Sequence, residues 1–164
     1  MINSAINLRH LLYRSAAIAL VAAATGCTNF RSDVENDLDA AMAQWEANGY
    51  ASYSMHYEHV GFAGNLAAKV HIEAGSVVAF EDVTVYGDTV SDSLLVVWNI
   101  EISSFHSIEG LFGIIEAAVG EQADEIAVTY HADLGYPETI YIDYIKLAID
   151  DERSFYASDV MEKL

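Results

Sequence analysis

The chain has 164 residues, of which 53% are hydrophobic, and its 25 acidic and seven basic side chains give a net charge of −18. So acidic a protein would be repelled by nucleic acid and by anionic lipid, which argues against both as charge-attracted partners. The hydrophobic content is too high for a disordered chain. We therefore expect a folded domain with a solvated acidic surface, and we keep a docking face for a basic partner or a cation as the alternative.

Residues 1–26 have the three parts of a secretory signal sequence. They include Arg9 and Arg14 but no acidic residue, then an unbroken apolar run over 16–24, and small residues before Cys27. The apolar run is well short of the ~20 residues that span a bilayer, so we predict a cleaved segment and not a permanent anchor. Removing 26 of the 164 residues leaves 138, and the loss of two basic residues takes the net charge from −18 to −20.

Cys27 is the only cysteine, and the sequence Thr25-Gly26-Cys27 resembles the bacterial lipobox, although Ala24 stands where leucine is usual. The resemblance implies that Cys27 is lipidated by two or three acyl chains, enough for stable anchoring. Thr28 replaces the aspartate that would resemble an inner-membrane retention signal, so we expect the periplasmic face of the outer membrane. The alternative is an ordinary signal peptide with an incidental cysteine.

The mature chain begins with a predicted lipidated tether over 27–32, followed by a single domain over 33–164. Apolar residues at helical spacing predict a helix from Asp33 to Asn48, with acidic residues in its first turns and Gly49 after its end. Alternating polar and apolar residues then predict strands. These strands cover 50–60, 68–73, 76–86 and 94–102, with a short turn at Ala74-Gly75-Ser76 and a polar loop over 87–93.

The second half repeats this alternation between helical and extended patterns. Ser107 is placed to cap a helix whose apolar stripe runs from Ile108 to Val119, and Gly120 is placed to end it. Further strands are predicted over 125–131, 139–145 and 155–160. Strands that follow one another with few crossovers favour an α+β fold, in which an antiparallel sheet of five to seven strands has both helices packed on one face.

Three segments resemble a known family: the Trp45 helix leading into YASYSMHYE, the AGSVVAFEDV hairpin, and the C-terminal stretch VTYHADLGYPETIYIDYIKLAIDDERSFYASDV. The most specific elements are Gly135-Tyr136-Pro137, Ile142-Asp143 and Asp150-Asp151-Glu152. The sequence resembles an uncharacterised family of bacterial envelope lipoproteins that carry a domain of unknown function. Many members have a close cysteine pair after the first strand, but residues 59–63 here contain none. The resemblance therefore implies a location and a fold, without an activity.

Two sets of side chains could bind metal. His56, His71 and His131 lie in predicted strands opposite the main apolar set, and they could converge on Zn²⁺ if those strands were neighbours. No HxH or HExxH spacing supports that site, so surface histidines are the favoured interpretation.

The other set comprises Asp143, Asp150, Asp151 and Glu152, which offer the oxygen ligands that Ca²⁺ takes. Because no Asp-x-Asp-x-Asp-Gly loop is present and aspartate is common in turns, we favour a turn there.

The mature region contains no GxSxG elbow, no glycine-rich phosphate loop and, after lipidation, no cysteine nucleophile. We therefore predict no catalytic residue and no cofactor. The leading hypothesis is a non-catalytic interaction module, held at the membrane by the Cys27 lipid, that binds an envelope protein or component through its sheet face or a tyrosine-bearing loop. Candidate interface residues are Tyr50, Tyr53, Tyr57, Tyr136, Tyr141 and Tyr144. The second hypothesis is a small-ligand or cation site between the second helix and the sheet, and the third is a hydrolase.

Overall fold

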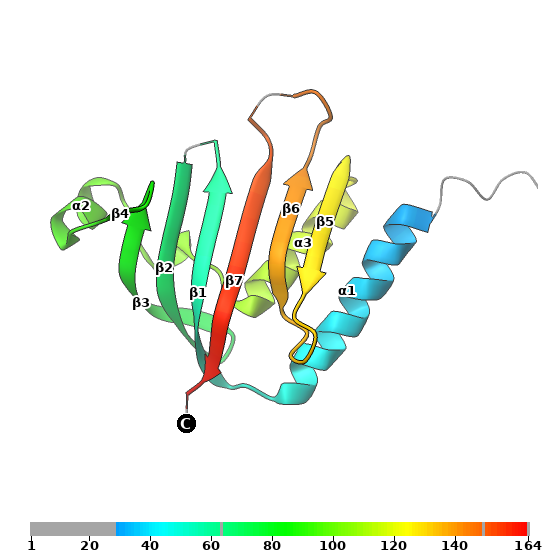
Figure 1. The fold of residues 1–164 in the computed structure, drawn as a ribbon, viewed down its shortest axis with the longest axis horizontal. Coiled ribbons are helices and arrows are strands. Elements are labelled where there is room, and N and C mark those ends of the chain that lie inside the picture. Colours follow the sequence, from blue (N-terminus) through cyan, green and yellow to red (C-terminus); the bar gives the residue numbers. More distant parts are fainter. Residues whose placement is uncertain (1–28, 63, 149, 164) are drawn as a thin grey trace, which may run out of the picture.

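Seven strands form one antiparallel sheet in the order β4-β3-β2-β1-β7-β6-β5 (Figure 1). The computed structural model describes residues 29–62, 64–148 and 150–163, and every count of elements refers to those residues. Along the chain the elements are α1 (Asn29–Asn48), β1 (Ser52–Gly61), β2 (Gly64–Glu73), β3 (Ser76–Val85), β4 (Asp88–Thr89), α2 (Asp92–Val97), the 3₁₀ turn η1 (Ile102–Ser104), α3 (Ile108–Glu121), β5 (Glu125–Tyr130), β6 (Pro137–Asp143) and β7 (Arg153–Glu162). The predicted α+β class and strand number are confirmed.

The same order of elements occurs twice in the chain. A helix is followed by a three-stranded meander, first as α1-β1-β2-β3 and then as α3-β5-β6-β7. The two meanders join where β1 pairs antiparallel with β7, with Tyr57 opposite Ala157 and His59 opposite Phe155. The centre of the sheet is therefore built from strands that lie about a hundred residues apart in the sequence.

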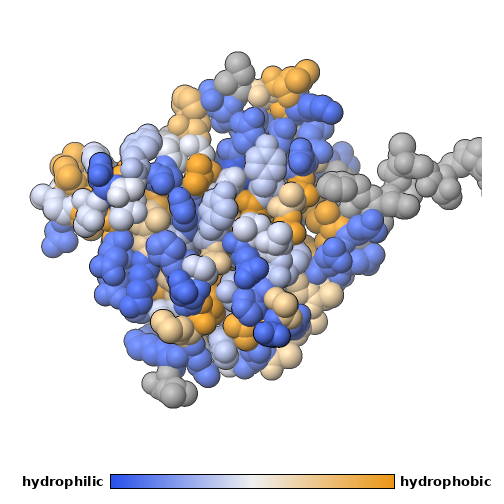
Figure 2. All heavy atoms as spheres, in the orientation of Figure 1, coloured by the Kyte–Doolittle hydropathy of each residue, from blue (hydrophilic) through white to orange (hydrophobic). Residues whose placement is uncertain are grey.

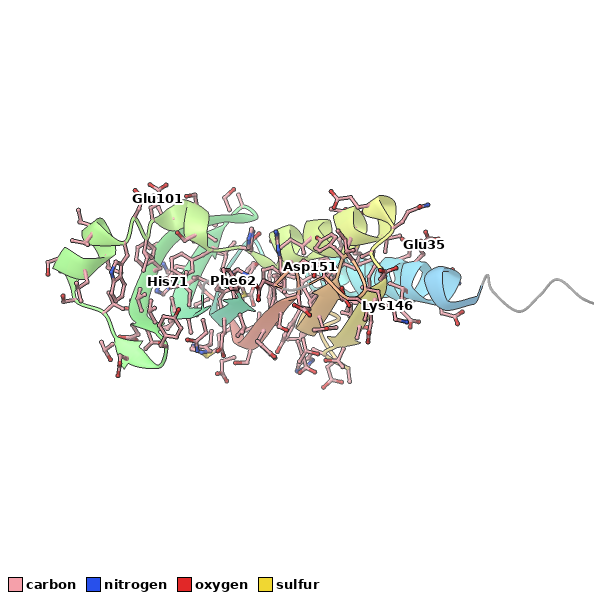
Figure 3. The ribbon with its side chains drawn as sticks, turned by 90° about the horizontal axis from the view of Figure 1, so that it is seen from above. Glu35, Phe62, His71, Glu101, Lys146 and Asp151 are labelled. Carbon is pink, nitrogen blue, oxygen red and sulfur yellow. The ribbon has the colours of Figure 1, made fainter. Side chains whose placement is uncertain are left out.

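The core lies between one face of the sheet and the helices. Seen from above, α3 lies on one side of the strands (Figure 3), and α1 packs beside α3 and against β5. Alternate strand residues point to this side, because successive side chains in a strand face opposite ways. The buried strand residues include Tyr53, Met55, Tyr57, Val70, Ile72, Ile140, Ile142 and Phe155, and the helices add Leu38, Trp45, Ile108, Leu111, Phe112 and Ile115.

The start of α3 is fixed to the β2–β3 hairpin by one serine. The Ser107 hydroxyl accepts a hydrogen bond from the Gly110 amide at 3.1 Å and donates one to the Gly75 carbonyl at 2.7 Å. The hairpin turn itself uses positive φ angles at Ala74 and Gly75, 49° and 74°, which suit the twist of a two-residue hairpin. Both the predicted cap and the predicted turn are confirmed.

The strand predicted over 94–102 is wrong. This stretch contains α2, a turn at Asn99 with φ 54°, and η1. Beyond β3, the sheet continues only with the two residues of β4, which lie in the predicted 87–93 loop. The apolar run over 94–102 therefore has no long edge strand with which to pair. Alternation of apolar residues alone does not distinguish a strand from a short helix.

Two helix boundaries also differ from the prediction. The first helix begins at Asn29, inside the predicted tether over 27–32 and before Asp33. The second continues past Gly120 to Glu121 and is capped by Gln122 in the left-handed conformation. The predicted signal segment 1–26 and Cys27 lie outside the described residues.

Candidate functional site

The loop-end cavity, as we call it, has a volume of about 810 Å³ and opens at the end of the sheet where β1 turns into β2. Its walls come from this turn, the end of β3, the segment between α2 and η1, and the start of β7. Apolar side chains such as Leu66, Val85 and Ile100 share the wall with the polar residues His59, Asn65, Asn99, Ser104, Asp150, Glu152 and Arg153. A hollow of this size, with apolar walls and a set of polar groups, is typical of small-molecule sites.

His59 is a half-buried polar residue of the loop-end cavity. It continues the inward alternation of Tyr53, Met55 and Tyr57 along β1, and its ring stacks on Phe155 with 4.7 Å between ring centroids. Its Nε2 atom is buried and has no hydrogen-bond partner within the described chain. Burial lowers the pKa of His59 below its ordinary value, and the nearby charges of His106 and Arg153 lower it further. The ring is therefore neutral at pH 7 and has one nitrogen available.

His106 and Tyr57 extend this polar group into the core. The His106 ring lies 6.0 Å from Phe155 and 6.1 Å from Tyr57, centroid to centroid. Burial lowers the pKa of His106 and raises the pKa of Tyr57. The Tyr57 hydroxyl is also buried without a hydrogen-bond partner among the described residues. Buried polar atoms are nearly always paired, so two unpaired atoms on neighbouring inward positions of β1 call for an explanation.

The mouth of the loop-end cavity combines charge with exposed apolar rings. Arg153, Asp150 and Glu152 line it from the start of β7 and the loop before it, and Phe62 and Trp98 line it from the other side. The Arg153 guanidinium lies 5.6 Å from the centroid of the Tyr144 ring, a cation–π contact that limits where its charge can reach. A ligand with an apolar body and a polar end could place its body against the apolar side chains of the cavity and its polar end near a polar group, either inside the cavity or at its mouth.

A second hollow, of about 430 Å³, lies between α1 and α3. Its floor holds the Glu109 carboxylate, which accepts hydrogen bonds from Trp45 Nε1 at 3.1 Å and from the Tyr53 hydroxyl at 2.8 Å. The Tyr53 hydroxyl in turn accepts the Ile108 amide at 2.8 Å. Burial and the adjacent Glu109 charge raise the pKa of Tyr53. These bonds tie α1, β1 and α3 together, so we assign this network to stability.

The family described as "Family of unknown function (DUF6174)" matches residues 37–162. The chain belongs to this family. The matched range runs from α1 to the end of β7, and so includes all of the residues described at the loop-end cavity. No curated protein and no solved structure matches the chain. Within the described part of this DUF6174 protein, no helix combines the length and apolar character needed to cross a bilayer.

The DUF6174 fold does not bring the three predicted zinc ligands together. His56 and His71 share the solvent face of β1 and β2, where the Glu81 carboxylate lies 3.1 Å from His71 Nε2. His131 lies just after β5, beyond β7 and β6, and its Nδ1 accepts the amides of Asp133 and Leu134. The zinc alternative, which the sequence did not favour, therefore does not fit this strand order. Sequence reasoning overlooked His59 and His106, and the alternation of β1 was the signal that could have placed His59 inside.

The four predicted acidic ligands divide between two places. Asp143 and Asp151 both accept the Ile145 amide, at 3.1 Å and 2.7 Å, while Asp150 and Glu152 line the loop-end cavity. Desolvation, together with the charges of Asp151 and Glu152, raises the pKa of Asp143. In the part of the DUF6174 chain that the structure describes, no group of three or more His, Cys, Asp or Glu side chains is placed to hold a metal ion.

Three of the six tyrosines predicted at an interface are structural. Tyr53, Tyr57 and Tyr136 are buried in the core, so they are not accessible to a partner. Tyr141 and Tyr144 are half-buried near the β6–β7 loop, and Tyr50 edges the hollow between α1 and α3. Tyrosines occupy inward-facing positions of this DUF6174 domain because the tyrosine ring is a large apolar group that packs well in a core.

The buried histidines predict a pH-dependent stability. His59 and His106 have folded-state pKa values below the ordinary 6.5, so the unfolded chain binds protons more readily. Their stabilising contribution is present above about pH 6.5 and is lost as the pH falls toward the folded-state values. We expect denaturant midpoints to fall between about pH 7.5 and pH 5.5, and His106→Gln to flatten that slope. The exposed His56→Gln is the control, and an unchanged slope in His106→Gln would contradict the assignment.

Proposed function

We propose that this protein is an envelope lipoprotein whose folded domain is a non-catalytic binding module. In this proposal residues 1–26 are removed, Cys27 is lipidated, and the domain is held at the periplasmic face of the outer membrane. The support is the sequence: a basic start, a short apolar run, and small residues before the sole cysteine. The membership in DUF6174 is compatible with this and adds no activity of its own.

We further propose that the binding site is the loop-end cavity. One observation carries this: the half-buried His59 lines a cavity of about 810 Å³, and its Nε2 atom, buried behind the cavity wall, has no hydrogen-bond partner among the described residues. A ligand that hydrogen-bonds to this nitrogen would remove the cost of leaving it unpaired, about 1 to 3 kcal/mol for a buried polar group. The remaining wall is mainly apolar, so the ligand class is one with an apolar body and a polar head.

Binding is better supported than hydrolysis. A histidine base needs a nucleophile within hydrogen-bond reach and a third group that orients the ring. His59 is held by stacking on Phe155, and neither requirement is met at its Nε2 by any residue that the structure describes.

The test is a titration of the mature protein with an uncharged fluorescent long-chain alcohol, because Asp150 and Glu152 at the cavity mouth would repel a carboxylate. Gly61 lines the cavity, and a Cβ there would lie 3.4 Å from His59 Nε2, so Gly61→Leu would fill the space in front of the ring. We expect this variant to bind the probe at least about tenfold more weakly, because a filled cavity excludes the ligand. Gly113→Leu, on α3 with nothing within 4 Å of its Cβ, is the matched control. Equal probe affinity in both variants would rule out the cavity as the site.

A further inference from the structure

We propose that the loop end of the domain lies against the lipid bilayer, with the apolar side chains of α2, the β1–β2 turn and the β6–β7 loop in contact with it. The inference rests on the proposed lipid anchor at Cys27. It adds a second, non-covalent contact that fixes the orientation of the domain on the membrane.

The first observation is a helix whose apolar side chains are mostly exposed. The helix α2 has the sequence DSLLVV and contains no fully buried residue; of its side chains only Leu95 packs partly against the core. Val96 is 82% exposed, and Trp98 directly after the helix is 49% exposed. Apolar side chains held in water in this way call for an apolar surface beyond the small contact that Leu95 makes with the domain.

The second observation is that other exposed apolar side chains gather at the same end. Phe62 in the β1–β2 turn is 77% exposed, and Leu147 in the β6–β7 loop is 93% exposed. These segments lie at the upper end of the sheet in Figure 1, and Figure 2 shows hydrophobic surface at the top and at the α2 end. Figure 3 looks down on this end, with Phe62 and Lys146 labelled. Exposed large apolar residues in these segments and in α2 with the residue after it are Phe62, Leu94, Val96, Val97, Trp98, Ile145 and Leu147.

The third observation identifies the bilayer as the occupant. The helix α1 begins at Asn29, and its first turn lies at the side of the sheet next to β5, below the β6–β7 loop but nearer to that end of the sheet than the rest of the helix (Figure 1). Cys27 precedes Asn29 by two residues, which span at most about 7 Å when extended. Acyl chains on Cys27 would therefore enter the bilayer on this side of the domain, and the hydrocarbon interior beneath the headgroups is an apolar region wide enough to receive side chains from three separate segments.

Charge does not drive this contact. Lys146 stands between two exposed apolar residues at the loop tip, but Asp150, Asp151 and Glu152 follow in the same loop. With so acidic a domain, anionic lipid would repel it, so insertion of apolar side chains has to supply the attraction. The contact should then form on zwitterionic lipid and be insensitive to salt.

The protein contains two tryptophans that report on the two ends of the domain. Trp98 lies on the apolar end, whereas Trp45 is 5% exposed near the C-terminal end of α1. The experiment places the mature lipidated protein on phosphatidylcholine vesicles with nitroxide-labelled acyl chains. We expect the Trp98 emission to fall at least about twofold, and Trp98→Phe, which leaves only Trp45, to lose the quenching.

Two further variants separate insertion from simple proximity. Leu147→Asp should reduce the quenching of Trp98, because a charged side chain resists entry into lipid. Val78→Asp, an exposed apolar site on β3, should leave it unchanged. Unmodified Cys27 in mass spectrometry would overturn the proposed lipoprotein and this inference with it. A lipidated, vesicle-bound protein with unquenched Trp98 would overturn the inference alone, and would leave the apolar end to a protein partner.

Discussion

Gly135→Ala is expected to lower the free energy of unfolding by at least about 2 kcal/mol, among the largest effects of any single methyl group in this protein. Gly135 has φ +79°, a conformation that is strained for alanine. Its Cβ would also lie 2.6 Å from the Ala41 carbonyl oxygen and 2.8 Å from Gln44 Cβ, inside any permitted contact. The carbonyl belongs to the backbone of α1, so the loop itself would have to move away.

The cost is high because this loop is what docks α1 on the second meander. Gln44 donates to the Ala132 carbonyl at 2.8 Å and Asn48 to the Leu134 carbonyl at 3.0 Å, while Trp45 meets Tyr136 edge-to-face at 6.3 Å. Displacing Gly135 weakens all three contacts together.

Gly113→Ala is the matched control for this prediction. It lies inside α3 with open space around its Cβ, so alanine should stabilise the helix by up to about 1 kcal/mol. Urea unfolding measures the change in stability, which should be a loss in Gly135→Ala and a gain in Gly113→Ala. A Gly135→Ala midpoint at or above that of wild type would contradict the docking role of the loop.

Tyr53→Phe is expected to cost about 1 to 3 kcal/mol of stability without changing the shape of the core. The Tyr53 hydroxyl is the donor to Glu109 and the acceptor of the Ile108 amide, and phenylalanine can do neither. The substitution would leave the buried amide at the start of α3 without a partner. Denaturant unfolding at neutral pH is the measurement.

Tyr57→Phe removes the same atom two inward positions further along β1 and should not lower the stability. Both tyrosines are completely buried, but the Tyr57 hydroxyl has no partner within the described residues. Removing an unpaired buried hydroxyl should leave the stability unchanged or raise it. If the two variants lost stability equally, the hydrogen bonds of Tyr53 would not be the source of its effect.

The sequence by itself was enough for the local structure. Alternation along 50–60 and 68–73 determined which residues of β1 and β2 face the core, because the side-chain period of a strand is two. Ser107 and Ala74-Gly75 marked a helix cap and a hairpin turn, since both depend on the chemistry of a few adjacent residues. These local signals also gave the α+β class, because short connections leave few other ways to pack helices and strands.

The tertiary structure alone decided which distant residues meet. Alternation places His59 on the inner face of β1, but only pairing with β7 puts it on Phe155, and only the segment before α3 brings His106 beside it. Apolar character over 94–102 predicted burial, whereas the edge of the sheet had no further strand to receive it, so α2 remains exposed. The local sequence pattern determines which face of a strand a residue occupies and whether it tends to be buried. The residues that it contacts depend on the order of the strands in the sheet, which no local property of the sequence encodes.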